Sequence, residues 1–146
     1  MEKIKIETLA VLGVLGAAMA KLLGGWDMAL QTLIGFMVTD YLTGMAVAAV
    51  FHKSLKTEGG ALSSAVGLRG LFKKSGMLLV VYIACCLDAF TASNYVRDMA
   101  VTALIANELV SITENLGLMG VPLPKVVTGA VELLMRKEES DDQAGN

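Results

Sequence analysis

Acidic side chains interrupt two stretches of the chain that are otherwise largely apolar. Asp40 lies near the middle of the stretch from Met28 to Phe51, and Glu108 lies in the stretch from Val96 to Leu116. No phosphate-binding glycine loop, nucleophile elbow or Ser/His/Asp arrangement accompanies them. The chemistry open to such acids is contact with ions, water or polar groups of another helix, so we predict that the chain is not an enzyme.

The composition indicates what surrounds these acids. The chain has 146 residues, of which 55% are hydrophobic and 18% charged, and its mean hydropathy is +0.63. Soluble domains usually have about 45–50% apolar and about 25% charged residues. The deviation predicts an integral membrane protein. Four spans of about 20 residues would use more than half of the chain and leave no room for a separate soluble enzyme.

Four apolar blocks separated by polar or glycine-rich breaks predict an all-α fold with about four transmembrane helices. The predicted spans are residues 6–23, 26–51, 75–92 and 96–116. Each is long enough to cross a hydrocarbon core of about 30 Å, although the fourth is markedly polar. We expect residues 1–137 to form one membrane-embedded domain and the acidic residues 138–146 to form a disordered tail.

The basic residues predict the orientation of the spans. All but Lys21 and Arg97 lie before the first span, between the second and third spans, or after the fourth. The positive-inside rule then places both termini and the central loop in the cytoplasm. We expect the loop either to lie on the inner membrane surface, bound to anionic headgroups, or to be a plain basic loop. Its basic residues are Lys53, Lys56, Arg69, Lys73 and Lys74.

The first apolar block has two interpretations. Its basic start and the triplet at residues 18–20 resemble a cleavable signal peptide, and cleavage would leave three spans. Alternatively, small residues spaced three or four apart form one helix face on which a second helix packs closely. This small-residue face consists of Ala10, Gly13, Ala17, Ala20 and Gly24. The mass of the mature N-terminus distinguishes the two interpretations.

We expect Asp40 to face another helix and not lipid, because an Asp at the centre of a transmembrane helix disfavours membrane insertion by about 2.5–3.5 kcal/mol. Thr43, Gly44 and Ala48 share its helix face, and the two small residues allow another helix to approach. The fourth span offers polar partners at helical spacing, namely Asn107, Glu108, Ser111, Glu114 and Asn115. We expect these residues to pack helices together or to line a pore. A purely structural hydrogen bond, worth about 0.6–2 kcal/mol, is the alternative for Asp40 and Glu108.

Other reactive residues have simpler interpretations. Cys85 and Cys86 are adjacent in one helix and cannot be joined without distorting it, so we expect packing roles. His52 has no second ligand at metal-binding spacing, and we predict neither a metal nor a cofactor. Asp88 either lines a pore or lies at the membrane interface. The last acid and the last amide of the fourth span, Glu114 and Asn115, are alternatively ordinary helix-end residues.

Four motifs in series resemble the toxin-secretion/phage-lysis family of phage holins. They are DYLTG at 40–44, LSSAVGLRGLFKK at 62–74, NELVSITEN at 107–115 and GVPLPK at 120–125. The similarity extends over residues 35–125, which is nearly two-thirds of the chain. The family pattern also includes Tyr41, and Pro122 and Pro124 in the turn after the last span. The segment after Pro124 is less basic at its start than the family pattern leads us to expect.

The resemblance implies a holin. Such a protein oligomerises in the cytoplasmic (inner) membrane of the host, as a multi-pass protein, and forms a lesion that releases an endolysin or a large toxin. The implied partners are the lipid bilayer, further copies of the chain, and the released endolysin or toxin, with no nucleic acid. Two other classes stay open from the residues alone. One is a small ion or solute channel or transporter, because buried acids can serve a cation path. The other is a membrane scaffold subunit without a pore.

Overall fold

The computed structural model describes residues 1–144, and no strand occurs among them. This confirms the predicted all-α class. Apart from the short 3-10 turn η1 (Glu58–Gly60), the elements are five α-helices, namely α1 (Glu2–Leu22), α2 (Met28–Ala49), α3 (Ser64–Thr91), α4 (Val96–Leu118) and α5 (Lys125–Ala144).

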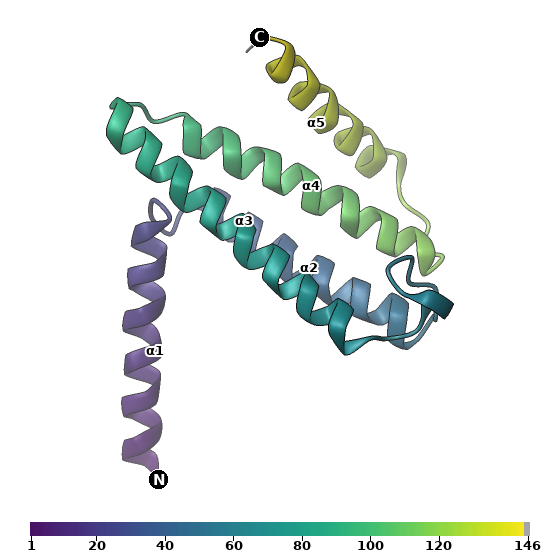
Figure 1. The fold of residues 1–146 in the computed structure, drawn as a ribbon, viewed down its shortest axis with the longest axis horizontal. Coiled ribbons are helices and arrows are strands. Elements are labelled where there is room, and N and C mark those ends of the chain that lie inside the picture. Colours follow the sequence, from purple (N-terminus) through teal and green to yellow (C-terminus); the bar gives the residue numbers. More distant parts are fainter. Residues whose placement is uncertain (145–146) are drawn as a thin grey trace.

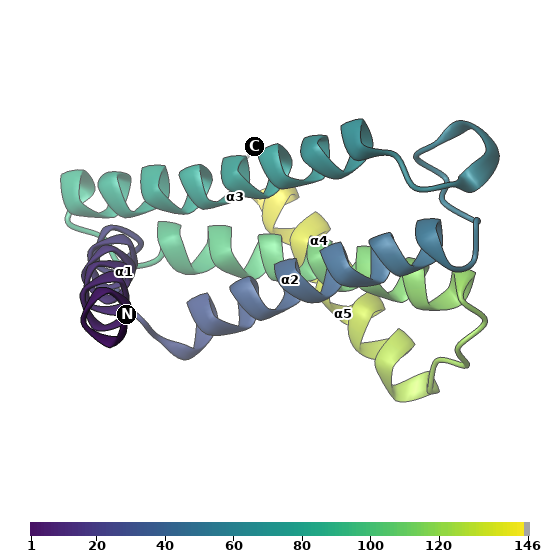
Figure 2. The same cartoon turned by 90° about the horizontal axis from the view of Figure 1, so that it is seen from below.

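Helices α2, α3 and α4 form the body of the molecule (Figures 1 and 2). They are antiparallel in sequence order, and α4 is the main packing partner of both α2 and α3. The apolar core joins Leu30 and Leu33 of α2 to Val81 of α3 and Val101 of α4, and all four side chains are 0% exposed. This packing places the middles of the three helices, where the acids lie, next to one another.

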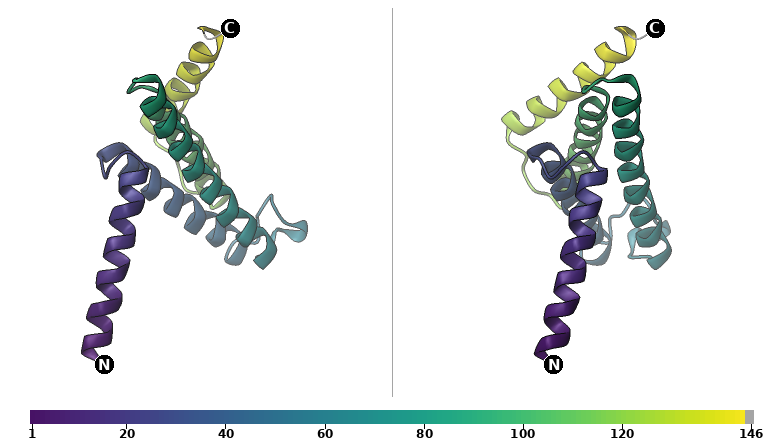
Figure 3. Two further views of the ribbon diagram at one scale, coloured as in Figure 1. Left: turned by 60° about the vertical axis from the view of Figure 1, so that its left-hand side comes forward. Right: turned by 90° about the vertical axis from the view of Figure 1, so that its left-hand side faces the viewer.

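Helix α1 stands apart from the body at a steep angle (Figure 1) and contributes no buried residue. Gly24 and Gly25 form the turn into α2 with φ of +88° and +109°, a region that glycine enters without strain. Asp27 then caps α2, because its Oδ1 accepts a hydrogen bond from the Leu30 N–H at 2.8 Å. The N- and C-terminal helices extend to opposite ends of the molecule (Figure 3).

Helix α3 begins earlier than the sequence predicted. The expected span started at residue 75, after the basic loop, whereas α3 is continuous from Ser64 to Thr91. Gly67 and Gly70 do not interrupt it, because both face the Tyr41 ring of α2. A Cβ at Gly67 would lie 3.5 Å from Tyr41 Oη, and one at Gly70 would lie 3.7 Å from the ring. Interhelical packing therefore outweighs the low helix propensity of glycine.

The chain after α4 also differs from the expectation. The predicted turn at Pro122 and Pro124 separates α4 from α5, which begins at Lys125 directly after the second proline. Helix α5 then continues to Ala144, where the sequence predicted a disordered tail over residues 138–146. The last two residues of that tail lie outside the described part of the chain.

Two of the described helices, α2 and α3, are long and apolar enough to cross a membrane, judged by length and composition. Helices α1 and α4 have similar lengths, 21 and 23 residues. Charged residues at both ends of α1, and charged and amide residues spread along α4, make these two helices less apolar. Two of the four predicted spans thus meet this criterion.

The distribution of side chains differs from that in a soluble bundle. Nine large apolar side chains of α1 are more than half exposed. Those of α3 include Phe72, Leu79 and Phe90, which are 70%, 60% and 90% exposed. The interior of the body, in contrast, contains Asp40, Glu108 and two further polar residues, each less than 9% exposed. Continuous exposed apolar faces of this kind are typical of contact with lipid or with another protein.

Candidate functional site: a polar cluster inside the helical body

A single lysine bridges two carboxylates from different helices. Lys74 Nζ of α3 donates hydrogen bonds to Asp40 Oδ2 of α2 at 2.7 Å and to Glu108 Oε2 of α4 at 2.5 Å. The three side chains are 12%, 10% and 3% exposed, respectively. One ammonium thus neutralises part of the charge of two buried acids, and the cluster joins all three helices of the body.

Asn115 completes the cluster from α4. Its Nδ2 donates to Asp40 Oδ1 at 3.0 Å and to Thr43 Oγ1 at 3.0 Å. The two oxygens of Asp40 are therefore bonded to different helices, one to α3 and the other to α4. Gly44 lies beside this contact, and a Cβ there would be 3.6 Å from Asn115 Nδ2, an ordinary van der Waals distance. Such pairing is what buried polar groups require.

The structure brings together part of the residue set that the sequence singled out. The polar face of α2 meets Glu108 and Asn115 of α4, and Ala48 is buried next to this contact. Asn107 and Glu114 are exposed and take no part in the hydrogen bonds of the cluster. Ser111 is half-buried and lies beside the cluster at a cavity.

Lys74 is the residue of this cluster that sequence reasoning placed wrongly. It was expected in the basic loop outside the helical body, but its side chain points inward from the third turn of α3. Two buried acids need a cation, because an unpaired buried charge is expensive. The sequence offered one signal for this partner, because Lys74 is the last basic residue before the third predicted span.

A second polar cluster lies at the junction of α1, α2 and α4. Arg97 is 8% exposed and donates through Nε to Leu23 O at 2.8 Å and through Nη1 to Asp27 Oδ2 at 2.6 Å. The hydrogen bond from Arg97 lowers the pKa of Asp27, which lies in the turn before α2. Gly24 makes this arrangement possible, because a Cβ there would lie 2.5 Å from Arg97 Nε.

This contact changes the interpretation of the predicted small-residue face. Gly24 packs on the arginine of its own chain and does not extend a free helix face. The other members lie on α1, where Ala10, Gly13 and Ala17 are exposed and Ala20 is half-buried. Nothing lies within 4 Å of a Cβ built at Gly13. Within one copy of the chain, this face is open.

Asp88 lies in the α3–α4 junction, away from the Lys74 cluster. Its carboxylate accepts hydrogen bonds from the backbone N–H groups of Val96 at 3.1 Å and Arg97 at 2.9 Å, and from the Ser93 hydroxyl. These bonds satisfy amides at the start of α4 that have no partner within the helix. The geometry gives Asp88 a helix-capping role at the end of the helical body.

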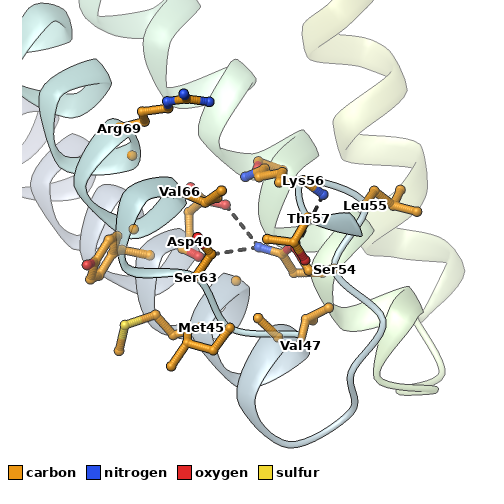
Figure 4. Close-up of a pocket in the computed structure, with 18 of the residues that line it drawn as sticks. Asp40, Met45, Val47, Ser54, Leu55, Lys56, Thr57, Ser63, Val66 and Arg69 are labelled. Atoms are coloured by element: carbon orange, nitrogen blue, oxygen red, sulfur yellow. Dashed lines mark hydrogen bonds between the residues drawn. The ribbon is translucent and has the colours of Figure 1, made fainter. Parts of the chain in front are cut away.

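A cavity of about 410 Å³ opens beside the Lys74 cluster, between α2, α3, the end of α4 and the loop of residues 54–57 (Figure 4). The loop is held in place because the Lys53 N–H bonds to Val47 O, and the Ser54 N–H bonds to Gly60 O, both at 3.1 Å. Gly60 has φ of +73°, and a Cβ there would lie 2.1 Å from His52 O. Only glycine fits this position, so the loop forms a defined wall.

Cys85 and Cys86 of α3 are free thiols. Within residues 1–144, no group of three His, Cys, Asp or Glu side chains has a spacing suited to a metal ion.

Comparison with known proteins adds an independent result. The sequence profile of the bacteriophage holin family matches residues 17–136. The chain is 33% identical over 120 residues to a probable holin of Bacillus phage phi105, with 79% of the chain and 83% of that protein covered. It is 31% identical over 141 residues to an uncharacterized protein of Listeria monocytogenes, covering 94% of the chain and 95% of that protein. An uncharacterized protein of Clostridium perfringens is 36% identical over 125 residues, covering 84% and 87%. No solved structure matches the chain.

Proposed function

The chain belongs to the bacteriophage holin family, and we propose that it acts as a holin. In this proposal it oligomerises in the cytoplasmic membrane of the host and forms a lesion through which an endolysin, or a large toxin, leaves the cell. Family membership indicates a membrane protein whose role is not catalytic. The identity of the released protein is part of the proposal.

The observation that carries the proposal is the combination of an apolar exterior with a buried polar cluster. Lys74, Asp40 and Glu108 lie inside the body, whereas the large side chains of α1 and α3 are exposed. In water this arrangement would expose apolar surface and bury charge, and both are unfavourable. In lipid the same arrangement is favourable, because apolar faces meet acyl chains and polar groups are paired inside the bundle.

We place four helices, α1 to α4, across the membrane with both termini in the cytoplasm. Because α2, α3 and α4 are antiparallel, the loop of residues 50–63 and the α4–α5 turn lie at one end of the body (Figure 2). That end carries more basic residues than the opposite end, where Lys21 and Arg97 lie, and would be cytoplasmic. Helix α1 joins the other three at a steep angle through Gly24 and Gly25, so a shared transmembrane direction requires rotation at this turn.

The proposed mechanism separates assembly from opening. The open small-residue face of α1 packs against other copies in the membrane, whereas Gly44 and Ala48 of α2 already lie at the contact with α4. The polar faces of α2 and α4 stay paired with Lys74 during accumulation. A collective rearrangement then separates α2 from α4, and the residues of the cluster line a water-filled lesion. Water replaces the hydrogen bonds that the helices lose.

A small ion or solute channel or transporter is the second candidate function. It is favoured by the position of the Lys74 cluster, because two acids and a lysine lie beside a cavity that opens at one end of the body. Paired ionisable groups at membrane depth mark ion and proton paths in many transporters. This candidate predicts conduction without cell death.

Induced expression in bacteria distinguishes the two functions. The chain is expressed with a folded cytoplasmic endolysin, and with an inactive endolysin variant as the matched control. A holin causes an abrupt loss of viability in both cultures, but lysis only with the active endolysin, whose activity appears outside the cells. Continued growth with saturable movement of an ion or solute would contradict the proposed lesion.

A further inference from the structure

The cavity beside the Lys74 cluster has a cationic rim. Lys56 of the loop and Lys73 of α3 line it and are exposed, and Arg69 lies on the same side of α3 (Figure 4). Within the described part of the chain, none of the three takes part in an ion pair, since the ion pairs there involve only Lys74 and Arg97 as cations. The acids that line the cavity are Asp40, which Lys74 already binds, and the exposed Glu114. The rim thus carries positive charge without a partner.

The walls of the same cavity are largely aliphatic. Val47 comes from α2, Leu55 from the loop and Val66 from α3, and Leu62 precedes α3. Leu55 and Leu62 are 84% and 56% exposed, although each belongs to the folded wall of the cavity. A volume of about 410 Å³ lies within the range of small-molecule sites, about 300–1,000 Å³. The site suits a ligand that has an anionic head and an apolar body.

The position of the cavity identifies the class of that ligand. The cavity lies where α2 ends and α3 begins, and these are the two helices apolar enough to cross a membrane. If the chain lies in the membrane as we propose, the rim is at the level of the headgroups and the aliphatic walls reach into the acyl region. On this basis we propose that the cavity binds one anionic phospholipid, with its phosphate at Lys56, Lys73 and Arg69.

The bound lipid would contact three elements of the closed body at once. Its phosphate lies between the loop and α3, and its first acyl segments lie against Val47 of α2 and Val66 of α3. The anion stays at the rim, because Lys74 is committed to Asp40 and Glu108 deeper in the body. A free phosphate would use the rim but gain nothing from the exposed Leu55 and Leu62.

Native mass spectrometry of the purified full chain in detergent tests this site. The probes are phosphatidylglycerol, phosphatidylcholine with the same acyl chains, and inorganic phosphate. The rim variant is Lys56→Gln/Lys73→Gln, and the matched control is Lys3→Gln/Lys5→Gln on the exposed start of α1. A cation near an anionic headgroup contributes about fivefold in affinity. We therefore expect the rim variant to bind phosphatidylglycerol about 25-fold more weakly and the control to bind it as the parent chain does.

A third variant tests the lipid part of the proposal. Leu55→Gln/Leu62→Gln should weaken binding of phosphatidylglycerol but leave any binding of inorganic phosphate unchanged. Equal binding of phosphatidylcholine and phosphatidylglycerol, or equal loss in the rim and control variants, would overturn the site. Phosphate that competes at the same concentration as the lipid would show a phosphate site and overturn the lipid assignment.

The outcome is separable from that of the proposed holin function. A chain that releases endolysin from cells but binds no phosphatidylglycerol contradicts this site only. A chain that binds the lipid with the expected variant pattern but releases no endolysin contradicts the lesion only.

Discussion

Removing the ammonium of Lys74 should destabilise the helical body strongly. The substitution Lys74→Met keeps an unbranched side chain of similar length but removes both hydrogen bonds, at 2.7 Å to Asp40 and 2.5 Å to Glu108. A hydrogen bond to a charged group contributes about 1.5–3 kcal/mol. Breaking a buried ion pair from one side costs about 3–5 kcal/mol, because the remaining charge stays buried. We expect Lys74→Met to lower the free energy of unfolding by about 3–5 kcal/mol.

Neutralising the whole cluster should recover most of the lost free energy of unfolding. The triple variant Lys74→Met/Asp40→Asn/Glu108→Gln has no buried charge at this site. Replacing all members of a buried ion pair with uncharged residues often changes stability little. Unfolding is measured by titrating SDS into mixed micelles and following helical circular dichroism. Lys73→Met is the matched control, because Lys73 is the adjacent, exposed lysine, and it should change stability by less than about 0.5 kcal/mol. The reasoning is refuted if the two single variants are equally stable, or if the triple variant is no more stable than Lys74→Met.

Three further predictions concern individual residues. Asp40→Asn and Glu108→Gln should each change the time of lysis without preventing membrane insertion, and unchanged timing for both would remove these acids from the mechanism. Gly24→Ala should cost about 1–3 kcal/mol in SDS titration, because φ is +88° and the new Cβ meets the packed arginine. Gly13→Ala, in open space on α1, is its control and should not destabilise the chain. Asp88→Ala should cost about 1–2 kcal/mol through loss of the bonds to the first amides of α4, and a change below 0.3 kcal/mol would contradict that capping role.

The sequence was sufficient to predict the helical class and most helix positions. Apolar block length predicted α2 and α4 to within a few residues, because their ends coincide with turn residues such as Gly25. Helical spacing also predicted that Asp40 and Thr43 share a face, and that face meets Asn115 in the structure. These features follow from local patterns that recur every three or four residues.

Other features depend on contacts between distant residues and were not predictable in this way. The start of α3 was missed because Gly67 and Gly70 resemble loop residues until Tyr41 of α2 packs against them. Lys74 was assigned to the surface because the local sequence does not distinguish it from Lys73. Of the two, only Lys74 lies on the inward face of α3. Gly24 was assigned to a helix-packing face because nothing in its local sequence indicates an arginine 73 positions later in the chain.

The proposed mechanism requires that the paired faces of α2 and α4 are buried before the lesion forms and meet water afterwards. Val101 tests it directly, because it is 0% exposed and lies two helical turns before Glu108 on the same face of α4. In a chain lacking the native cysteines, Val101→Cys is labelled with a membrane-impermeant thiol reagent in membranes opened to both sides.

Two control positions calibrate the labelling. Ser63→Cys, just before α3, reports that the reagent reaches the cytoplasmic end, and Leu79→Cys reports the exposed apolar face of α3. In membranes collected before lysis, we predict that only the cysteine at position 63 reacts. In membranes collected after lysis, the cysteine at position 101 should react as well, while the one at position 79 stays unlabelled. A cysteine at position 101 that stays unreactive after lysis, or that reacts fully before it, would contradict the account.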